Sequence, residues 1–344
     1  MSKVAPSGKY LNLDEVRISY RPKDDSIHIT SGDEDLAGSA FHLTLPQGSE
    51  SEQILRELLL EQGLIRPVTE SPLPEKLELE LTRFSPSNEI VLGKTETGNL
   101  MWDVTRHPHA LMVGRTGSGK STVIRTLFAH CLTHSKQWEF NGIDLKNVEL
   151  APYKQFARTV GSIVHTVDDA FQLVNDLVSR MEMRYDQMGK EGVNRYIDLK
   201  TPVRAVLLVV DESTMLMGWS DDEYYKTHAQ ANISKLLRLG RAAGIHLLFS
   251  TQNVDNNLFS GEMRNNITTR IAMGRLTASE SALLLSTPAA TRVQGNVRGR
   301  GIFSNFDEEY PFQAAFTSLE ALTEWVKEYG EAAEPELHYS LTKR

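Results

Sequence analysis

Hydrophobic and polar positions along the first 75 residues predict a small domain of mixed structure. Apolar and polar side chains alternate over residues 16–30 on either side of "RPKDD", which predicts a β-hairpin. A further strand is expected at "AFHLTL" (40–45), and "SESEQILRELLLEQGL" (49–64) predicts a helix. The proline-rich stretch "RPVTESPLPEK" that follows is typical of a linker. We therefore predict a small α+β domain with its linker at residues 1–75.

A different pattern begins at about residue 76. The segments "LELELTRF" and "NEIVLGKTETGNLMWDV" predict strands, with a turn at "TETGN". Beyond them, apolar runs alternate with helical patterns, which is typical of a parallel sheet covered by helices on both faces. The strands expected in that sheet span residues 110–113, 139–143, 162–165, 205–210, 245–250 and 269–273. We predict an α/β fold with a mostly parallel sheet for residues 76–344.

Two helices of this second domain stand out. In "DDAFQLVNDLVSRMEMRYDQM" (168–188), apolar side chains recur every three or four positions, as on one face of an amphipathic helix. The members of this stripe are Ala170, Phe171, Val174, Leu177, Val178, Met181, Tyr185 and Met188. We interpret the stripe as core packing. The segment "SLEALTEWVKEYGEA" predicts a last helix at 318–332.

Composition favours a soluble globular protein of the cytoplasm. The chain is 40% hydrophobic and 24% charged. The longest apolar run of a predicted element is "AVLLVV", far short of the roughly 20 residues that a membrane helix needs. The first residues lack the apolar core of a signal peptide, so we expect no membrane insertion. The single cysteine, Cys131, cannot form an internal disulfide and is expected to pack on a helix face.

The segment "LMVGRTGSGKST" (111–122) matches the phosphate-binding pattern G-x-x-x-x-G-K-[ST]. Glycines allow successive backbone N–H groups to point at phosphate oxygens, and the following helix adds its positive N-terminal end. Lys120 is expected to contact the β- and γ-phosphates of ATP, and the Ser121 hydroxyl to bind Mg²⁺. The residues expected to bind nucleotide are Gly114, Arg115, Thr116, Gly117, Ser118, Gly119, Lys120, Ser121 and Thr122.

The segment "AVLLVVDEST" adds the groups that hydrolysis requires. Its apolar run predicts a buried strand that ends at Asp211 and Glu212, where the carboxyl edge of an α/β sheet faces its ligand. Asp211 suits a hold on Mg²⁺, and Glu212 suits a general base that polarises the attacking water. Acidic residues also commonly follow strands at turns, so this interpretation depends on the phosphate-binding loop that precedes it.

Two further polar residues are candidates for catalysis. Gln252 ends the predicted strand "IHLLFSTQ", from which its amide can contact the γ-phosphate or the attacking water. Arg241 lies at the end of a predicted helix, where an ordinary surface arginine is equally typical. An arginine that acts on a neighbouring subunit's nucleotide would need an oligomer.

Seven separated blocks resemble the motor domain of the FtsK/SpoIIIE DNA translocases over about two-thirds of the chain. They are "PHALMVGRTGSGKS", "IDLKNVEL", "MEMRYDQM", "VVDE", "RAAGIHLLFSTQ", "TTRIA" and "GRGIF". The resemblance implies a RecA-like P-loop ATPase that forms a hexameric ring around double-stranded DNA and moves it by hydrolysing ATP. It places Lys120 and Ser121 in Walker A, Asp211 and Glu212 in Walker B, and Gln252 at the sensor.

The resemblance also gives roles to residues that their pattern alone leaves open. Arg241 falls on the arginine that acts in trans in this family. Asp144, Lys146 and Glu149 fall on a block that follows the second strand of the sheet, and the alternative for them is a loop held by salt bridges. In its lack of membrane spans and of a DNA-reading module, the chain is similar to compact members of the family from plasmids and mobile elements. The tether and the orientation signal are then expected to be missing or supplied by partners, and the N-terminal domain to recruit a partner or shape the entrance of the ring.

The surface that would hold DNA is the least defined part of the prediction. The net charge of −8 argues against binding through bulk electrostatics and leaves room for a local basic surface. A translocase contacts phosphates rather than bases. The last third of the chain is locally basic through Arg264, Arg270, Arg275, Arg292, Arg298 and Arg300. Solvated surface arginines are the alternative for each of them.

The predicted function is therefore that of an ATP hydrolase that moves double-stranded DNA, as a ring, in DNA transfer, segregation or plasmid maintenance. Two alternatives stay open. An ATPase of a protein-secretion system uses a motor domain of the same family. An ATP-dependent switch in partition or packaging would bind nucleotide without travelling along DNA.

Overall fold

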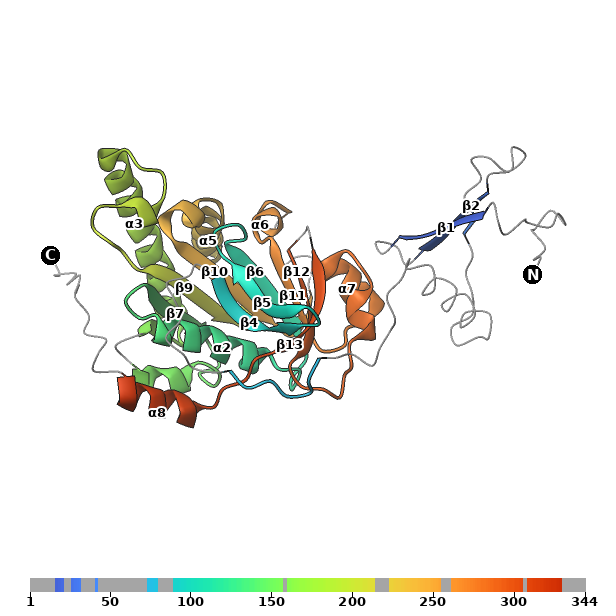
Figure 1. The fold of residues 1–344 in the computed structure, drawn as a ribbon. Helices are drawn as coiled ribbons and strands as arrows, with labels where there is room; N and C mark the ends of the chain where they lie inside the picture. The colour runs from blue at the N-terminus through green and yellow to red at the C-terminus, as the bar shows by residue number, and fades with distance from the viewer. Residues whose placement is uncertain are drawn as a thin grey trace. The chain divides into compact units, whose positions relative to one another are not determined.

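A computed structural model describes residues 16–21, 26–31, 41–42, 73–79, 89–156, 160–213, 223–254, 261–305 and 308–329. The chain divides into two compact units, Met1–Pro72 and Leu73–Arg344 (Figure 1). In the first unit, β1 (Val16–Arg21) and β2 (Ser26–Ser31) form an antiparallel hairpin, and β3 (Phe41–His42) pairs with β2. The hairpin and the third strand were predicted, whereas the helix expected at 49–64 lies outside the described residues.

The second unit is built on a ten-stranded sheet. Its strands are β4 (Glu89–Thr95), β5 (Gly98–Asp103), β6 (His109–Gly114), β7 (Trp138–Asp144), β8 (Val160–Val164), β9 (Ala205–Asp211), β10 (Ile245–Thr251), β11 (Thr269–Met273), β12 (Arg300–Ser304) and β13 (Glu309–Ala314). Their order is β5-β4-β13-β12-β11-β6-β10-β9-β7-β8. The six strands from β11 to β8 are mutually parallel, and the other four extend the sheet in antiparallel pairing.

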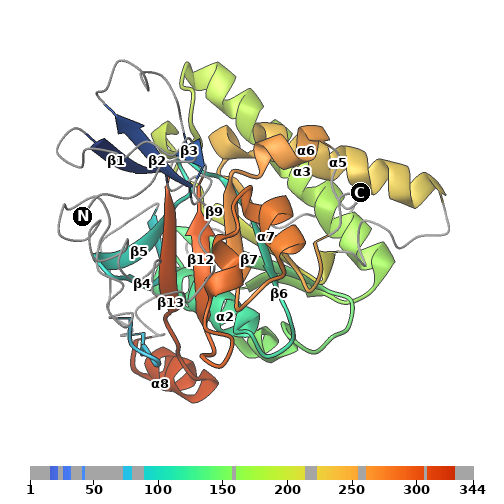
Figure 2. The ribbon, with the colours of Figure 1, turned by 90° about the vertical axis from the view of Figure 1, so that its right-hand side faces the viewer.

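Helices cover both faces of the sheet (Figure 1). They are α2 (Lys120–Thr133), α3 (Val167–Glu191), α5 (Glu223–Ala243), α6 (Gly261–Asn266), α7 (Ala278–Leu285) and α8 (Leu319–Tyr329), with the short 3₁₀ helices Ala151–Phe156, Tyr196–Asp198 and Ala289–Arg292. Helices α2 and α8 pack on one face, and α3, α5, α6 and α7 pack on the other. Figure 2 shows α7 beside the antiparallel end of the sheet.

The two layers explain the apolar runs in the central strands. Along β9, Leu207 and Val209 point to the α2 layer, whereas Val206 and Leu208 point to the α3 layer. Because both faces are buried, every position of such a strand is apolar. Among the described residues, no helix has both the length and the apolarity that a membrane crossing requires.

The predicted α/β fold with a mostly parallel sheet is confirmed. All six predicted strands are present, although β8 begins two residues before the expected start. The helix expected at 168–188 is α3, but the assignment of Tyr185 to its core face is wrong, because this side chain is 36% exposed. In the segment "LELELTRF", the described residues show only an isolated bridge from Glu78 to Phe316.

The topology brings several motifs to one edge of the sheet. Strands β6, β10, β9 and β7 are neighbours and run in parallel, so their carboxyl ends lie together. These ends are Gly114, Thr251, Asp211 and Asp144. Ligands of open α/β sheets bind at this edge.

Candidate active site

The phosphate loop, residues 114–122, joins β6 to α2 in a backbone path that glycine makes possible. Gly117 and Gly119 have φ values of 84° and 111°, in the left-handed region that side chains disfavour. No side chain of the described residues caps the start of α2, so helix N–H groups face this loop. The Ser118 hydroxyl is buried without a hydrogen-bond partner among the described residues. Unpaired donors around a tight loop fit phosphate oxygens.

Lys120 and Ser121 point their polar atoms to the same edge. The Lys120 ammonium donates to the carbonyl oxygen of Gly114, and burial lowers its pKa, against the attraction of Asp211 and other acidic groups. The Ser121 hydroxyl donates to Oε2 of Glu149 at 2.7 Å. The Ser121 oxygen therefore lies beside a carboxylate that sequence reasoning placed in this site only by resemblance.

Asp211 lies among other carboxylates at this edge. Asp211 lies opposite Asp144 in the register of β9 and β7. Burial, followed by the charges of Glu149 and Asp144, raises the pKa of Asp211 to about 6, against the lowering effect of Ser250. A hydroxyl among carboxylates is the hard-oxygen donor set that Mg²⁺ prefers, so these residues fit the predicted ion.

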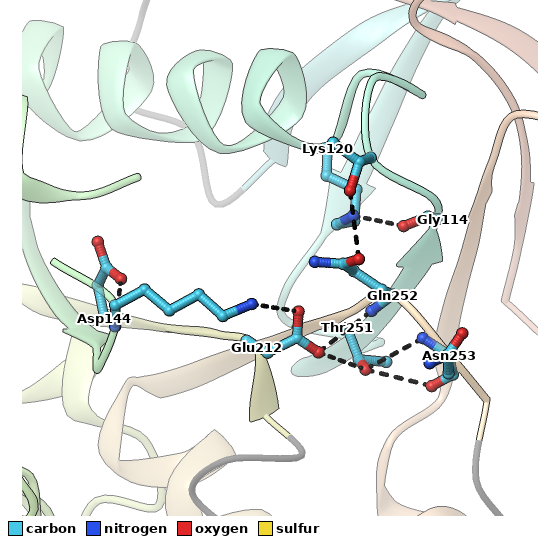
Figure 3. A network of polar contacts seen from close by, with 9 residues as sticks. Gly114, Lys120, Asp144, Glu212, Thr251, Gln252 and Asn253 are labelled. Carbon is cyan, nitrogen blue, oxygen red and sulfur yellow. Dashed lines mark hydrogen bonds and ion pairs between the residues drawn. The ribbon is translucent and has the colours of Figure 1, made fainter. Parts of the chain in front are cut away.

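Glu212 is held from three sides. Its Oε1 accepts from the Thr251 hydroxyl at 3.2 Å and from the Gln252 backbone N–H at 3.4 Å, and its Oε2 pairs with the Lys146 ammonium at 3.2 Å (Figure 3). The φ of Glu212 is 48°, and a left-handed conformation in a residue other than glycine costs about 1–3 kcal/mol. Strain of this kind gathers at functional sites.

Gln252 connects the phosphate loop to Glu212. Its side-chain oxygen accepts from the Thr116 hydroxyl at 3.2 Å, while its backbone N–H donates to Glu212. Figure 3 shows its side chain between Lys120 and Glu212. This is the position expected of a residue that contacts both nucleotide and attacking water.

The loop after β7 aims two more residues at the site. The buried Asp144 carboxylate accepts from the backbone N–H groups of Lys146, Val148 and Leu150 at 3.2, 2.8 and 2.9 Å. This loop, 144–150, therefore has a fixed shape, from which Lys146 reaches Glu212 and Glu149 reaches Ser121. The loop is held by hydrogen bonds to Asp144, and the ion pair of Lys146 is with the candidate base outside the loop.

Arg241 is the one predicted catalytic residue that the structure does not bring to this edge. It lies exposed in the last turn of α5, three residues before Gly244, which leads into β10. Gln252 follows the opposite end of that strand. Seven residues of strand separate the two ends by roughly 20 Å, at about 3.3 Å per residue. Arg241 is therefore remote from the nucleotide edge of its own chain.

Two of the six arginines considered for DNA contact are structural. The buried Arg300 donates to Gln313 Oε1 at 3.1 Å and to the carbonyl of Leu73 at 3.0 Å. The buried Arg270 donates to the carbonyl of Arg264 at 2.6 Å, and burial lowers its pKa to about 10. Their proposed role as surface contacts is thus corrected, because each guanidinium satisfies backbone groups inside the fold. The exposed members of the set are Arg275, Arg292 and Arg298.

A pocket of about 320 Å³ adjoins the phosphate loop at Thr122. Its walls include Lys76, Arg298, Gln313 and Phe316. Sequence reasoning missed this pocket, because its walls come from segments far apart in the chain that carry no common pattern.

Comparison with known proteins identifies this arrangement. Residues 80–202, which include the phosphate loop and the 144–150 loop, match the model of the FtsK/SpoIIIE family. Over these residues the chain carries a domain of the FtsK/SpoIIIE type. Its P-loop ATPase fold is RecA-like.

Relatives in sequence and solved structures also resemble this domain. DNA translocase FtsK of Lactococcus lactis subsp. cremoris (strain MG1363) is 30% identical over 277 residues, which is 74% of this chain and 36% of that protein. The chain thus spans about a third of such a relative. The solved structure of the pCW3 conjugation coupling protein TcpA, in its monomer form with ATPgS, matches with a TM-score of 0.69 at 23% identity. This match covers 94% of this chain and 95% of the TcpA chain. The cytoplasmic domain of the Thermomonospora curvata type VII secretion ATPase EccC has a TM-score of 0.58 at 24% identity, over 70% of this chain and 30% of its own.

Proposed function

We propose that the protein hydrolyses ATP and uses the energy to move double-stranded DNA as a ring oligomer. The observation that carries the proposal is the convergence of Lys120, Ser121, Asp211, Glu212 and Gln252 at one sheet edge of an FtsK/SpoIIIE-type domain. Both ATP and DNA are present in the cytoplasm, which is the compartment that we propose.

The phosphate loop holds the nucleotide in this mechanism. Backbone N–H groups of residues 115–119 and the Lys120 ammonium bind the phosphates, and the pocket beside Thr122 accommodates the nucleoside. Ser121 and Asp211 would hold Mg²⁺, with Glu149 as a hydrogen-bond acceptor behind Ser121. Bound Mg²⁺ supplies charge neutralisation at the β- and γ-phosphates.

Glu212 takes the proton of the attacking water. Thr251 and Lys146 orient its two carboxylate oxygens, so the base is held in one direction before the nucleotide arrives. Gln252 orients the water and, through Thr116, links the state of the phosphate loop to the end of β10.

Arg241 acts on the nucleotide of a neighbouring subunit. Its exposed side chain lies at the end of β10 opposite its own nucleotide edge, which supports a role in another subunit's site. Leu239 and Tyr185, which lie beside each other near this turn, are 40% and 36% exposed. Exposed apolar side chains around a functional arginine support a subunit interface here, and a hexamer is the ring that we propose.

Duplex DNA is the proposed load. The relatives are named DNA translocases, and Arg275 and Arg292 offer exposed cations for phosphates. The role of the first unit in recruiting a partner stays a prediction.

ATP turnover with and without linear duplex DNA, at defined salt, tests the proposal, followed by displacement of a triplex-forming strand. We expect DNA to raise turnover several-fold and the third strand to be released only with ATP. Turnover that DNA leaves unchanged would overturn the translocase function and favour a secretion ATPase. DNA-stimulated turnover without strand displacement would instead favour a switch that does not travel.

A further inference from the structure

The last turn of α5, which carries Arg241, is bound by two consecutive side chains of α3. The Arg184 guanidinium donates through Nη1 to the carbonyl oxygen of Ala243, the last residue of α5. The Tyr185 hydroxyl donates to the carbonyl oxygen of Leu239 at 2.8 Å. The two contacts lie on either side of Arg241 along the helix.

Burying the charged guanidinium of Arg184 costs free energy, and its hydrogen-bond partners offset that cost. Its side chain is almost fully buried, and burial lowers its pKa to about 10, which leaves it charged at neutral pH. Its Nη2 donates to the carbonyl oxygen of Arg204 at 2.7 Å, at the start of β9. A cation at the C-terminus of a helix is favoured by the helix dipole and by carbonyl groups that lack helical partners. One guanidinium thus joins α3, β9 and the end of α5.

The residue that follows the turn is closely packed as well. Gly244 has a φ of 70°, and its N–H donates to the carbonyl of Arg241 at 3.2 Å. A Cβ at Gly244 would lie 2.7 Å from the ring of Tyr196. The backbone of the last turn therefore has little room to move, while the Arg241 side chain itself stays exposed.

We propose that Arg184 and Tyr185 are positioning residues for Arg241. They fix the backbone from which Arg241 projects, and so they set where its guanidinium enters the neighbouring site. This inference rests on the proposed action of Arg241 in trans. A displacement of about 1 Å in a group that stabilises a transition state can lower the rate by as much as 100-fold. The contacts of Arg184 and Tyr185 with this turn are therefore expected to affect the rate of hydrolysis.

Subunit mixing tests this role. We expect Arg184→Lys, which keeps the charge but loses the fork of two donors, to lower turnover at least fivefold, and Tyr185→Phe about threefold. Each variant retains an intact phosphate loop, so assembly with an excess of Lys120→Ala subunits should raise the turnover per variant subunit towards the parent's value. Lys120→Ala subunits supply a well-placed Arg241 to the variant's nucleotide. Mixing with Arg241→Ala subunits should restore nothing, because neither partner then supplies that arginine correctly.

Glu182→Gln is the matched control. It breaks the ion pair from Glu182 to Lys235, which also joins α3 to α5 but lies more than a helical turn before Arg241. We expect its turnover to equal that of the parent. If Arg184→Lys does not fold, Tyr185→Phe alone decides, because it removes one hydroxyl at a part-exposed position.

The mixtures separate failure of this inference from failure of the proposed function. Arg241→Ala mixed with Lys120→Ala is the reference and must recover activity if Arg241 acts in trans. If the reference recovers and the Arg184 and Tyr185 variants do not, the positioning role is wrong. If the reference itself stays inactive, the trans action of Arg241 is wrong and the positioning role is rejected with it.

Discussion

The Lys146 ammonium lies 3.2 Å from Oε2 of Glu212, across 66 positions of sequence. Lys146 is half-exposed, whereas the Glu212 side chain is only 12% exposed. The other carboxylate oxygen is held by Thr251. Lys146 therefore completes the orientation of the candidate base from the solvent side.

Lys146→Met tests this orientation. A partly exposed ion pair contributes up to about 1 kcal/mol, so we expect kcat to fall roughly fivefold while ATP affinity stays unchanged. Steady-state kinetics and nucleotide titration measure the two effects separately. Lys154→Met is the control, because Lys154 contacts Asn147 and His165 and not Glu212. Equal kcat for parent and Lys146→Met would rule out the orienting role.

Glu212→Gln tests the base itself. The amide keeps the shape of the side chain and an oxygen for Thr251, but it cannot accept the proton of water. We expect kcat to fall by about 10²- to 10⁴-fold, with ATP still bound. Single-turnover hydrolysis and nucleotide titration provide the measurement. Parental turnover in this variant would show that another group is the base.

Glu149→Gln provides the comparison for that experiment. The partner of Glu149 is the Ser121 hydroxyl, not the attacking water, so we expect the substitution to act on Mg²⁺ binding. We expect the Mg²⁺ concentration for half-maximal turnover to rise several-fold, while kcat at saturating Mg²⁺ falls less than in Glu212→Gln. An Mg²⁺ dependence identical to the parent's would contradict this role of Glu149.

The fold and the phosphate loop could be predicted because their signals are local. An apolar strand, a run of glycines and a helical pattern are contiguous around Lys120, and the buried run before Asp211 identifies a central strand. The antiparallel extension could not be predicted, since the pairing of β12 with β11 and β13 depends on contacts between separate segments.

Residue roles were predicted least well where a side chain donates a hydrogen bond to the backbone of another segment. Arg300 and Arg270 look like surface cations in sequence, yet they bind carbonyl oxygens inside the fold. Tyr185 fits the apolar period of α3, but its hydroxyl donates to a backbone carbonyl of α5. Helical periodicity identifies a face and carries no information about which neighbouring element lies at its margin.

Gly299→Ala tests the contact between the phosphate loop and the antiparallel extension. Gly299 has a φ of 86°, its N–H donates to the Ser118 carbonyl at 2.9 Å, and a Cβ on Gly299 would lie 2.8 Å from Nε2 of Gln313. We expect the variant to lose about 1–2 kcal/mol of unfolding free energy and to bind ATP at least tenfold more weakly. Denaturant unfolding and nucleotide titration measure these effects.

Gly192→Ala separates backbone strain from loop distortion. Gly192 has a φ of 70° at the end of α3, and open space surrounds its Cβ position. We expect a similar loss of stability with ATP affinity unchanged. If both variants bound ATP like the parent, Gly299 would have no part in shaping the phosphate loop.

Three buried histidines predict a loss of stability in mild acid. Burial lowers the pKa of His109 and His130 to about 3 and that of His246 to about 4, whereas the unfolded value is about 6.5. Below pH 6.5 the unfolded chain binds protons that the folded chain does not, so the unfolding free energy falls with pH until these low values are reached. At pH 5.5 each histidine costs about 1.4 kcal/mol relative to neutral pH.

Urea unfolding followed by tryptophan fluorescence at pH 7.5, 6.5 and 5.5 measures the slope. His130→Phe, which keeps an aromatic ring beside His134 and Trp138, should reduce that slope by about one proton. A free energy that stays constant from pH 6.5 to 5.5 would refute the prediction.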